Sequence, residues 1–318
     1  MKKGWCELLS RKSPFDLTFY LISAGASLTV IALVGGILCI LISESTLSLE
    51  KFGVWGFISS TDWNPVKDSF GAATSLFGTA VTTGLSLVLA IPVAIGIAIF
   101  VTEIAPGFLK GPIGIAIELL AAIPSIIYGM WGLFTLAPIM ADKIEPALQK
   151  TIGSLPVLGV IFKGTPMGID LLTASVILSI MIIPFTASIS RDAFNLTPAV
   201  VKESAYALGA TKWEVVRKVV IPYSKLGIFG GVVLSLGRAL GETMAVAFVL
   251  GNNHQITSSL LDAAATITVT LANEFTEADT DIYLSSLFYL ALLLFTMSFI
   301  ILAIAKFLIL KAGRGVRK

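Results

Sequence analysis

The residues with the greatest capacity for chemistry are two charged side chains inside a long apolar run. Arg238 follows Leu226 by about 18 Å of helix, close to the middle of a bilayer. An arginine there costs roughly 2.5–3.5 kcal/mol, so it is expected to face a bundle interior or a water-filled path and to have a partner. Glu242 is at the i+4 position on the same helix face. One interpretation is a structural ion pair; the other, which we favour, is an oxyanion path in which Glu242 holds the guanidinium fork until the anion arrives.

Another apolar run contains further candidates for such a path. Ser125 and Tyr128 follow Pro124, and they are expected either to line the path or to make interhelical hydrogen bonds. Pro124 and Pro92 each remove a backbone hydrogen bond and are expected to kink their helices. Glu118, near the start of the same run, is expected to pair with a basic loop residue or to extend to the membrane surface.

The elements that position these residues are membrane-spanning helices. The chain has 318 residues, of which 56% are hydrophobic and only 13% are charged, whereas a soluble domain carries about 25% charged residues. Six runs have the roughly 20 apolar residues that a helix needs to cross a bilayer: Leu17–Ile42, Ala72–Val101, Ile113–Met140, Leu171–Ile189, Leu226–Leu250 and Tyr283–Leu310. The runs are continuously apolar, which excludes the alternating pattern of a membrane β-barrel. The first run is too long for a cleaved signal peptide and is kept as a span.

The composition also excludes several functions. A net charge of +2 gives no basic field for nucleic acid. The two cysteines, Cys6 and Cys39, lie in dissimilar surroundings and predict neither a disulfide nor a zinc site. The single histidine, His254, leaves no metal cluster and no hydrolytic triad. We expect no catalytic residues, no metal and no cofactor.

The basic residues predict the orientation. Sixteen Lys and Arg residues fall on the side of the two termini, and five fall in the loops of the opposite side. By the positive-inside rule both termini are cytoplasmic. The opposite loops are acidic and are either solvated or a docking surface for an external protein. Segment Ser258–Asn273 on that side is too polar for a span, and we expect an external, surface-lying helix or a re-entrant element there.

The long loop at residues 191–225 predicts a helical hairpin. Thr197 and Pro198 are expected to start a first helix, and Gly209 to end it. Thr211 and Glu214 have the spacing of a capping box and begin a second helix that is expected to end before Pro222. From the residues alone, the hairpin is either an amphipathic element resting on lipid or a contact for another protein.

This loop resembles the EAA loop of ABC-importer permeases. Residues 203–209 read E-S-A-Y-A-L-G where that family has E-A-A-x-x-x-G, and Val220-Ile221-Pro222 stands where I-x-L-P is usual. The resemblance implies that the loop is a coupling helix seated on an ATPase subunit. The coupling residues that it implies are Glu203, Ala205, Leu208, Gly209, Thr211 and Pro222.

Two more stretches narrow the resemblance to the permeases of the phosphate-specific importer. They are residues 237–246, G-R-A-L-G-E-T-M-A-V, and residues 118–129, E-L-L-A-A-I-P-S-I-I-Y-G. The long loop after the first span is similar to the PstC type rather than the PstA type. The chain has no phosphate-binding G-x-x-x-x-G-K-[ST] motif, so ATP must be bound by another polypeptide. The implied partners are an ATP-binding subunit dimer, a PstA-like permease, an external phosphate-binding protein, phosphate and membrane lipid.

The resulting expectation is an all-α membrane protein with six transmembrane helices. It resembles a type I ABC-importer permease of the bacterial inner membrane, with a five-helix core and an extra N-terminal span. Residues 1–70 are expected to hold the tail, first span and external loop, residues 71–310 the permease core, and residues 311–318 a cytoplasmic tail. The alternatives are a molybdate or sulfate permease, a polyamine permease disfavoured by Arg238, and an ion-coupled transporter in which Arg238, Glu242 and Glu118 relay protons. No internal symmetry supports that last alternative.

Overall fold

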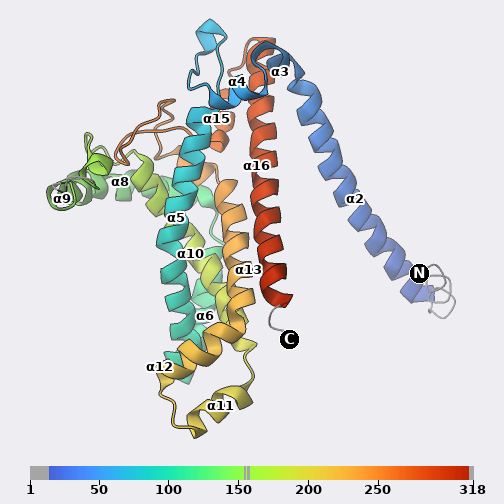
Figure 1. The fold of residues 1–318 in the computed structure, drawn as a ribbon, viewed down its shortest axis with the longest axis vertical. Helices are drawn as coiled ribbons and strands as arrows, with labels where there is room; N and C mark the ends of the chain where they lie inside the picture. The colour runs from blue at the N-terminus through green and yellow to red at the C-terminus, as the bar shows by residue number, and fades with distance from the viewer. Residues whose placement is uncertain (1–13, 154, 156–157, 315–318) are drawn as a thin grey trace.

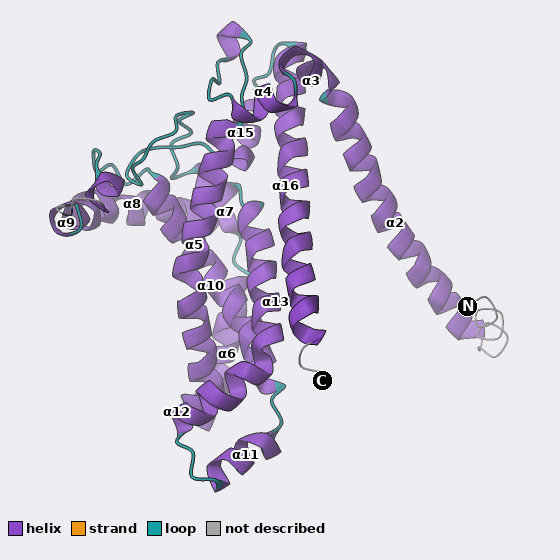
Figure 2. Cartoon of the chain, in the orientation of Figure 1, coloured by secondary structure: helices purple, strands orange, loops and turns teal. Residues whose placement is uncertain are grey.

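The computed structural model describes residues 14–153, 155 and 158–314, which form helices joined by loops, without a β-strand (Figure 2). The principal α-helices are α2 (Pro14–Glu44), α5 (Ala73–Ile99), α6 (Gly107–Ala121), α10 (Leu171–Asn195), α13 (Ile221–Leu240) and α16 (Asp281–Arg314). The shorter ones are α3 (Thr46–Phe52), α4 (Val54–Ser59), α7 (Ser125–Trp131), α8 (Ala137–Ile139), α9 (Glu145–Thr151), α11 (Ala199–Ala207), α12 (Lys212–Val215), α14 (Met244–Ala247) and α15 (Ile267–Glu274). Short 3₁₀ turns are η1 (Pro65–Lys67) and η5 (Leu158–Phe162), and π-type turns are η2 (Phe100–Ile104), η3 (Gly132–Leu136), η4 (Met140–Ile144) and η6 (Val216–Val220).

Six helical runs in the described part of the chain are long and apolar enough to cross a membrane, as predicted. The bundle is elongated, with α11 and α12 at one end (the α11 end) and α3, α4 and α15 at the other (the α15 end) (Figure 1). The basic tails at residues 1–12 and 315–318 lie outside the described residues, so the structure does not place them.

Helix α10 is the centre of the bundle. It packs against α5, α13 and α6, and two thirds of its most apolar window is buried. Its core side chains Ile177, Leu178, Met181 and Ile182 are at most 1% exposed. A helix that is apolar on all sides must be covered on all sides, which explains its central place.

The third predicted span, Ile113–Met140, is not one helix. Helix α6 ends at Ala121 and α7 begins at Ser125, with Pro124 at its N-cap position in an extended conformation. Because proline has no N–H and disfavours helical backbone in the residue before it, the break falls at this position. Beyond the break, the chain from α7 to α9 runs away from the bundle axis (Figure 2).

The fifth span lies earlier in the chain than predicted. Lys212–Leu240 is one helical run, so the expected end before Pro222 is wrong. Pro222 is the second residue of α13 and directly follows the π-type turn η6, an irregularity inside the run at which the missing N–H of proline is accommodated. The run ends at Leu240, with Gly241 as C-cap, instead of continuing to Leu250.

Helix α2 stands apart from the rest of the bundle. Its apolar side chains are almost all exposed, and Figure 1 shows it inclined away from α16. It is attached at the α15 end, where the Ser285 hydroxyl donates a hydrogen bond to the Glu44 carbonyl over 2.7 Å. Lipid or another membrane protein must cover this helix, because a bare apolar surface of this size is unstable in water.

The segment after the fifth span is folded inward. Of the two forms expected for Ser258–Asn273, the surface-lying helix is therefore wrong, whereas a re-entrant element is consistent with this burial. Helix α15 has Ile267, Val269 and Thr270 fully buried. The Thr79 hydroxyl of α5 accepts a 3.0 Å hydrogen bond from the Ile267 N–H at its start. The threonines that made the segment look exposed are satisfied by such buried hydrogen bonds.

Candidate functional site

Arg238 occupies the last turn of α13 and has no acidic partner among the described residues. Its Nε atom is buried without a hydrogen-bond acceptor. The carbon at the centre of the guanidinium lies 5.6 Å from the ring centroid of Phe185 on α10, which is within cation–π range. Phe185 has no feature in the sequence that distinguishes it from phenylalanines facing lipid. The helix C-terminus further favours a cation at this position.

The predicted pair between Arg238 and Glu242 does not form. Because α13 ends before Glu242, the two residues are not one turn apart on a shared helix face. The Glu242 carboxylate instead accepts a 3.2 Å hydrogen bond from the N–H of Ala245, in the first turn of α14. Its backbone carbonyl accepts 2.8 Å from the Thr268 hydroxyl. Glu242 therefore fixes the connection between α13 and α14, and it does not neutralise the Arg238 guanidinium.

Helix α7 brings one of the two candidates after Pro124 to the core cluster that contains Ala239, the residue after Arg238. This candidate is Tyr128, whose hydroxyl donates a 3.0 Å hydrogen bond to the Leu120 carbonyl across the break between α6 and α7. At Gly129 the helix approaches α14 so closely that a Cβ would lie 2.8 Å from the Met244 carbonyl. Ser125 is half-buried at the start of α7, and the structure gives it no polar partner among the described residues.

Glu118 makes the expected pair with a basic residue. Its carboxylate lies 2.7 Å from Nη2 of Arg191 on α10, and Arg191 also contacts Asp192 at 3.0 Å. The interaction joins α6 to α10 near the α11 end. Glu118 is thus engaged by Arg191 in this structure, and it makes no direct contact with Arg238 among the described residues.

The hairpin at the α11 end has most of the predicted local geometry. Thr211 and Glu214 form both hydrogen bonds of the capping box. Gly209 has a φ of +82°, in the left-handed region that favours glycine. Thr197 is not the helix cap, because α11 begins at Ala199 and the Thr197 hydroxyl lies 3.1 Å from that of Ser224.

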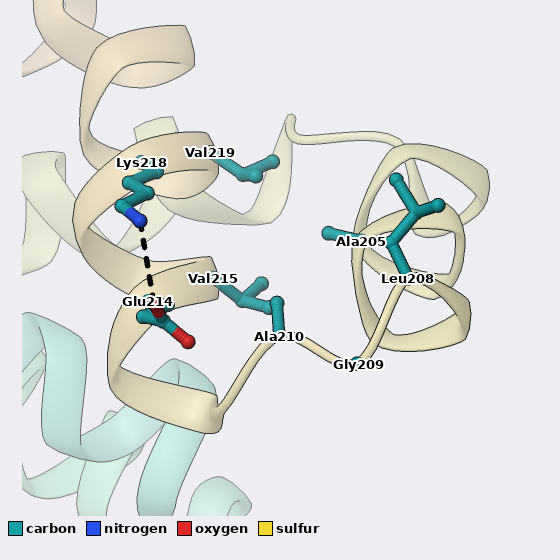
Figure 3. Close-up of a pocket in the computed structure, with 8 residues that line it drawn as sticks. All are labelled: Ala205, Leu208, Gly209, Ala210, Glu214, Val215, Lys218 and Val219. Atoms are coloured by element: carbon teal, nitrogen blue, oxygen red, sulfur yellow. Dashed lines mark hydrogen bonds and ion pairs between the residues drawn. The ribbon is translucent and has the colours of Figure 1, made fainter.

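Between the two helices of this hairpin lies a groove of about 370 Å³ (Figure 3). It is lined by Ala205, Leu208, Gly209, Ala210, Glu214, Val215, Lys218 and Val219. Leu208 is 90% exposed, whereas Val215 is fully buried and anchors the second helix to the bundle. Of the other implied coupling residues, Glu203 is exposed on α11, Thr211 caps α12, and Pro222 is exposed at the start of α13. The groove thus has one wall anchored to the bundle by Val215 and one wall that projects from the molecule.

A polar cluster that sequence reasoning missed lies at the α15 end. One carboxylate oxygen of Glu274 accepts 2.7 Å hydrogen bonds from Trp63 and Tyr283, and the other lies 3.1 Å from Nε2 of His254. Burial raises the pKa of Glu274, but the three partners outweigh burial and hold the pKa below its usual value. Trp63 is 211 residues from Glu274, and the other two partners come from separate loop and helix segments, so no local spacing indicates the cluster. No group of three or more potential metal ligands occurs among the described residues.

Comparison with known proteins identifies the family. The family model described as "Binding-protein-dependent transport system inner membrane component" matches residues 90–312. A phosphate transport system permease protein PstC of Mesorhizobium japonicum is 50% identical over 296 residues, covering 93% of this chain and 90% of the relative. PstC of Xylella fastidiosa is 50% identical over 294 residues, covering 92% and 90%.

A solved structure supports the fold. A chain of a bacterial ABC transporter that imports the acidic polysaccharide alginate superposes with a TM-score of 0.59 at 15% identity, covering 92% of this chain and 96% of that one. The six spans and the family match make this a multi-pass inner-membrane transport component. The chain therefore belongs to the family of binding-protein-dependent transport system inner membrane components, and within it to the group of the PstC permeases.

Proposed function

We propose that this chain is the permease subunit of an ATP-driven importer of inorganic phosphate and forms half of its translocation path. The observation that carries the proposal is the 50% identity to PstC permeases over nine tenths of the chain. The unpaired guanidinium of Arg238 suits it, because a planar fork with free donors binds a tetrahedral oxyanion bidentately. Glu242, Ser125 and Tyr128 are proposed to complete the path around it.

The partners follow from the family. ATP is hydrolysed by a separate ATP-binding subunit dimer, a PstA-like permease forms the other half of the path, and an external phosphate-binding protein delivers the anion. The groove beside Leu208 and Gly209 is proposed to seat part of the ATPase, because its projecting wall leaves an apolar side chain uncovered.

We infer that the α11 end lies in the cytoplasm. That end carries the basic residues Arg191, Lys202, Lys212, Arg217, Lys218 and Lys225, which the positive-inside rule assigns to the cytoplasmic side. Both termini are then cytoplasmic, and the α15 end faces the binding protein. Residues 71–310 are proposed to be the permease core.

Reconstitution of the complete importer in sealed vesicles tests the function. Labelled phosphate should enter only with internal ATP and the binding protein, and a collapsed proton gradient should leave uptake unchanged. Preferred uptake of sulfate or molybdate would contradict the substrate. Uptake that needs the proton gradient and not ATP would contradict the importer class.

A further inference from the structure

Phe185 and Arg238 are held in register by the packing of α10 against α13, which lie side by side in Figure 1. A buried hydrogen bond joins the residue after Phe185 to a residue one turn before Arg238. The Thr186 hydroxyl of α10 lies 2.6 Å from the Ser235 hydroxyl of α13, and both residues are fully buried. This contact fixes the two helices at the level of the aromatic ring and the guanidinium.

Among the described residues, the Phe185 ring is the group that interacts with the Arg238 guanidinium. Arg238 makes no ion pair and no hydrogen bond with them, its Nε atom is buried, and its guanidinium carbon lies 5.6 Å from the Phe185 centroid. An aromatic face attracts a cation through its quadrupole, but it leaves most of the N–H donors of the guanidinium without an acceptor. A carboxylate in the same place would neutralise the charge and occupy the fork.

We infer that Phe185 is a positioning residue for the anion site at Arg238. Its ring holds the guanidinium in a fixed orientation while leaving the charge and the N–H donors available to the transported anion. The inference rests on the proposed function, because it assigns Phe185 a role towards the same anion. It also explains how an arginine persists in the bundle without the acidic partner that such a residue normally has.

The test replaces the ring by rings of the same shape and a weaker quadrupole. Phenylalanine with one, two and three ring fluorines is incorporated at position 185 of the complete importer, and binding-protein-dependent phosphate uptake is measured in vesicles. Uptake should fall stepwise with each fluorine, to about a tenth of the original rate for the trifluorinated ring. Phe185→Trp should retain transport, and Phe185→Leu should lose about as much as the trifluorinated ring.

Phe229 provides a matched control, because it is on α13, is 57% exposed and has no cation over its ring among the described residues. The same fluorinated series at Phe229 should leave uptake unchanged. Uptake that is independent of fluorination at Phe185 would overturn the inference and leave phosphate import standing. A graded fluorine effect on the uptake of sulfate instead of phosphate would retain the role of Phe185 and contradict the proposed substrate.

Discussion

The Nε2 atom of His254 lies 3.1 Å from a carboxylate oxygen of Glu274, and the two side chains join the loop after α14 to helix α15. Trp63 stacks on the His254 ring at 5.3 Å and donates to the other oxygen of the same carboxylate. Tyr283 adds a third donor from α16. The contacts between these four segments of the α15 end therefore depend on the negative charge of Glu274.

This dependence predicts a loss of stability in acid. Because the folded-state pKa of Glu274 is below the ordinary value, its contribution is present above that ordinary value, about 4.5, and is lost as the pH falls through the folded pKa. Glu274→Gln should lower the free energy of unfolding by about 1–3 kcal/mol at pH 7, the cost of hydrogen bonds to a charged group. Thermal melting at pH 7 and below pH 4 checks this: the difference between the original chain and the variant should shrink in acid. The exposed Glu277→Gln should show no such difference, and a deficit of Glu274→Gln that is equal at both pH values would contradict the role of the charge.

Asp170 predicts the opposite pH dependence. Burial and the neighbouring Glu145 raise the pKa of this carboxyl, at the N-cap of α10, to about 7. A raised folded-state pKa means that stability is greatest below the unfolded value, about 3.8, and falls as the pH rises to about 7. Asp170→Asn keeps an oxygen for the Thr173 N–H and should remove this decline between pH 5 and pH 8. Melting temperatures of the original chain and the variant, measured at pH 5 and at pH 8, check this.

The control for Asp170 is Asp142→Asn on the neighbouring exposed surface. It should retain the decline of the original chain. A decline that persists unchanged in Asp170→Asn would show that another group titrates.

The number of spans and the capping box are predictable because both depend on local sequence. A run of apolar residues reports its own length, and the three-residue spacing of Thr211 and Glu214 suffices to place two hydrogen bonds. The end of α13 is different, because Gly241 is tolerated in many membrane helices and Glu242 is a good helix former. In the structure the break is followed by the close approach of α14 to α7 at Gly129, which no local pattern encodes. The same holds for Phe185, whose role comes from the register of α10 and α13.

Gly209 tests the coupling hairpin. A residue with a Cβ at φ +82° is strained by about 1–2 kcal/mol, although the space around Gly209 is open. Gly209→Val should therefore reduce phosphate uptake and uncouple ATP hydrolysis from the loaded binding protein. Gly209→Asn should be milder, because asparagine tolerates this conformation.

The matched control for Gly209 is Gly230→Ala, at an open helical position without positive φ. This variant should retain both phosphate uptake and the response of ATP hydrolysis to the loaded binding protein. Normal uptake by Gly209→Val at normal abundance would argue against a coupling role for the hairpin.

The proposed orientation is open to chemical labelling. In a background with Cys6→Ser and Cys39→Ser, a cysteine at Glu277 should react with an impermeant maleimide added to intact spheroplasts. A cysteine at Lys212 should react only after lysis, because the α11 end is proposed to be cytoplasmic. Both positions are exposed in the structure, and neither lines the groove that is proposed to seat the ATPase. The reverse pattern of labelling would invert the topology and remove the ATPase contact from the hairpin.

The last prediction separates the roles of Arg238 and Glu242. Arg238→Gln removes the charge and the fork, and phosphate uptake should fall about 10- to 100-fold while the importer still assembles. Glu242→Gln retains an oxygen for the Ala245 N–H and should reduce uptake less. Because the two side chains are not paired, the logarithmic losses in uptake should add in the double variant, within the scatter expected for independent sites. Uptake restored to normal in the double variant would instead identify a structural ion pair, and the site at Arg238 would then have no role in transport.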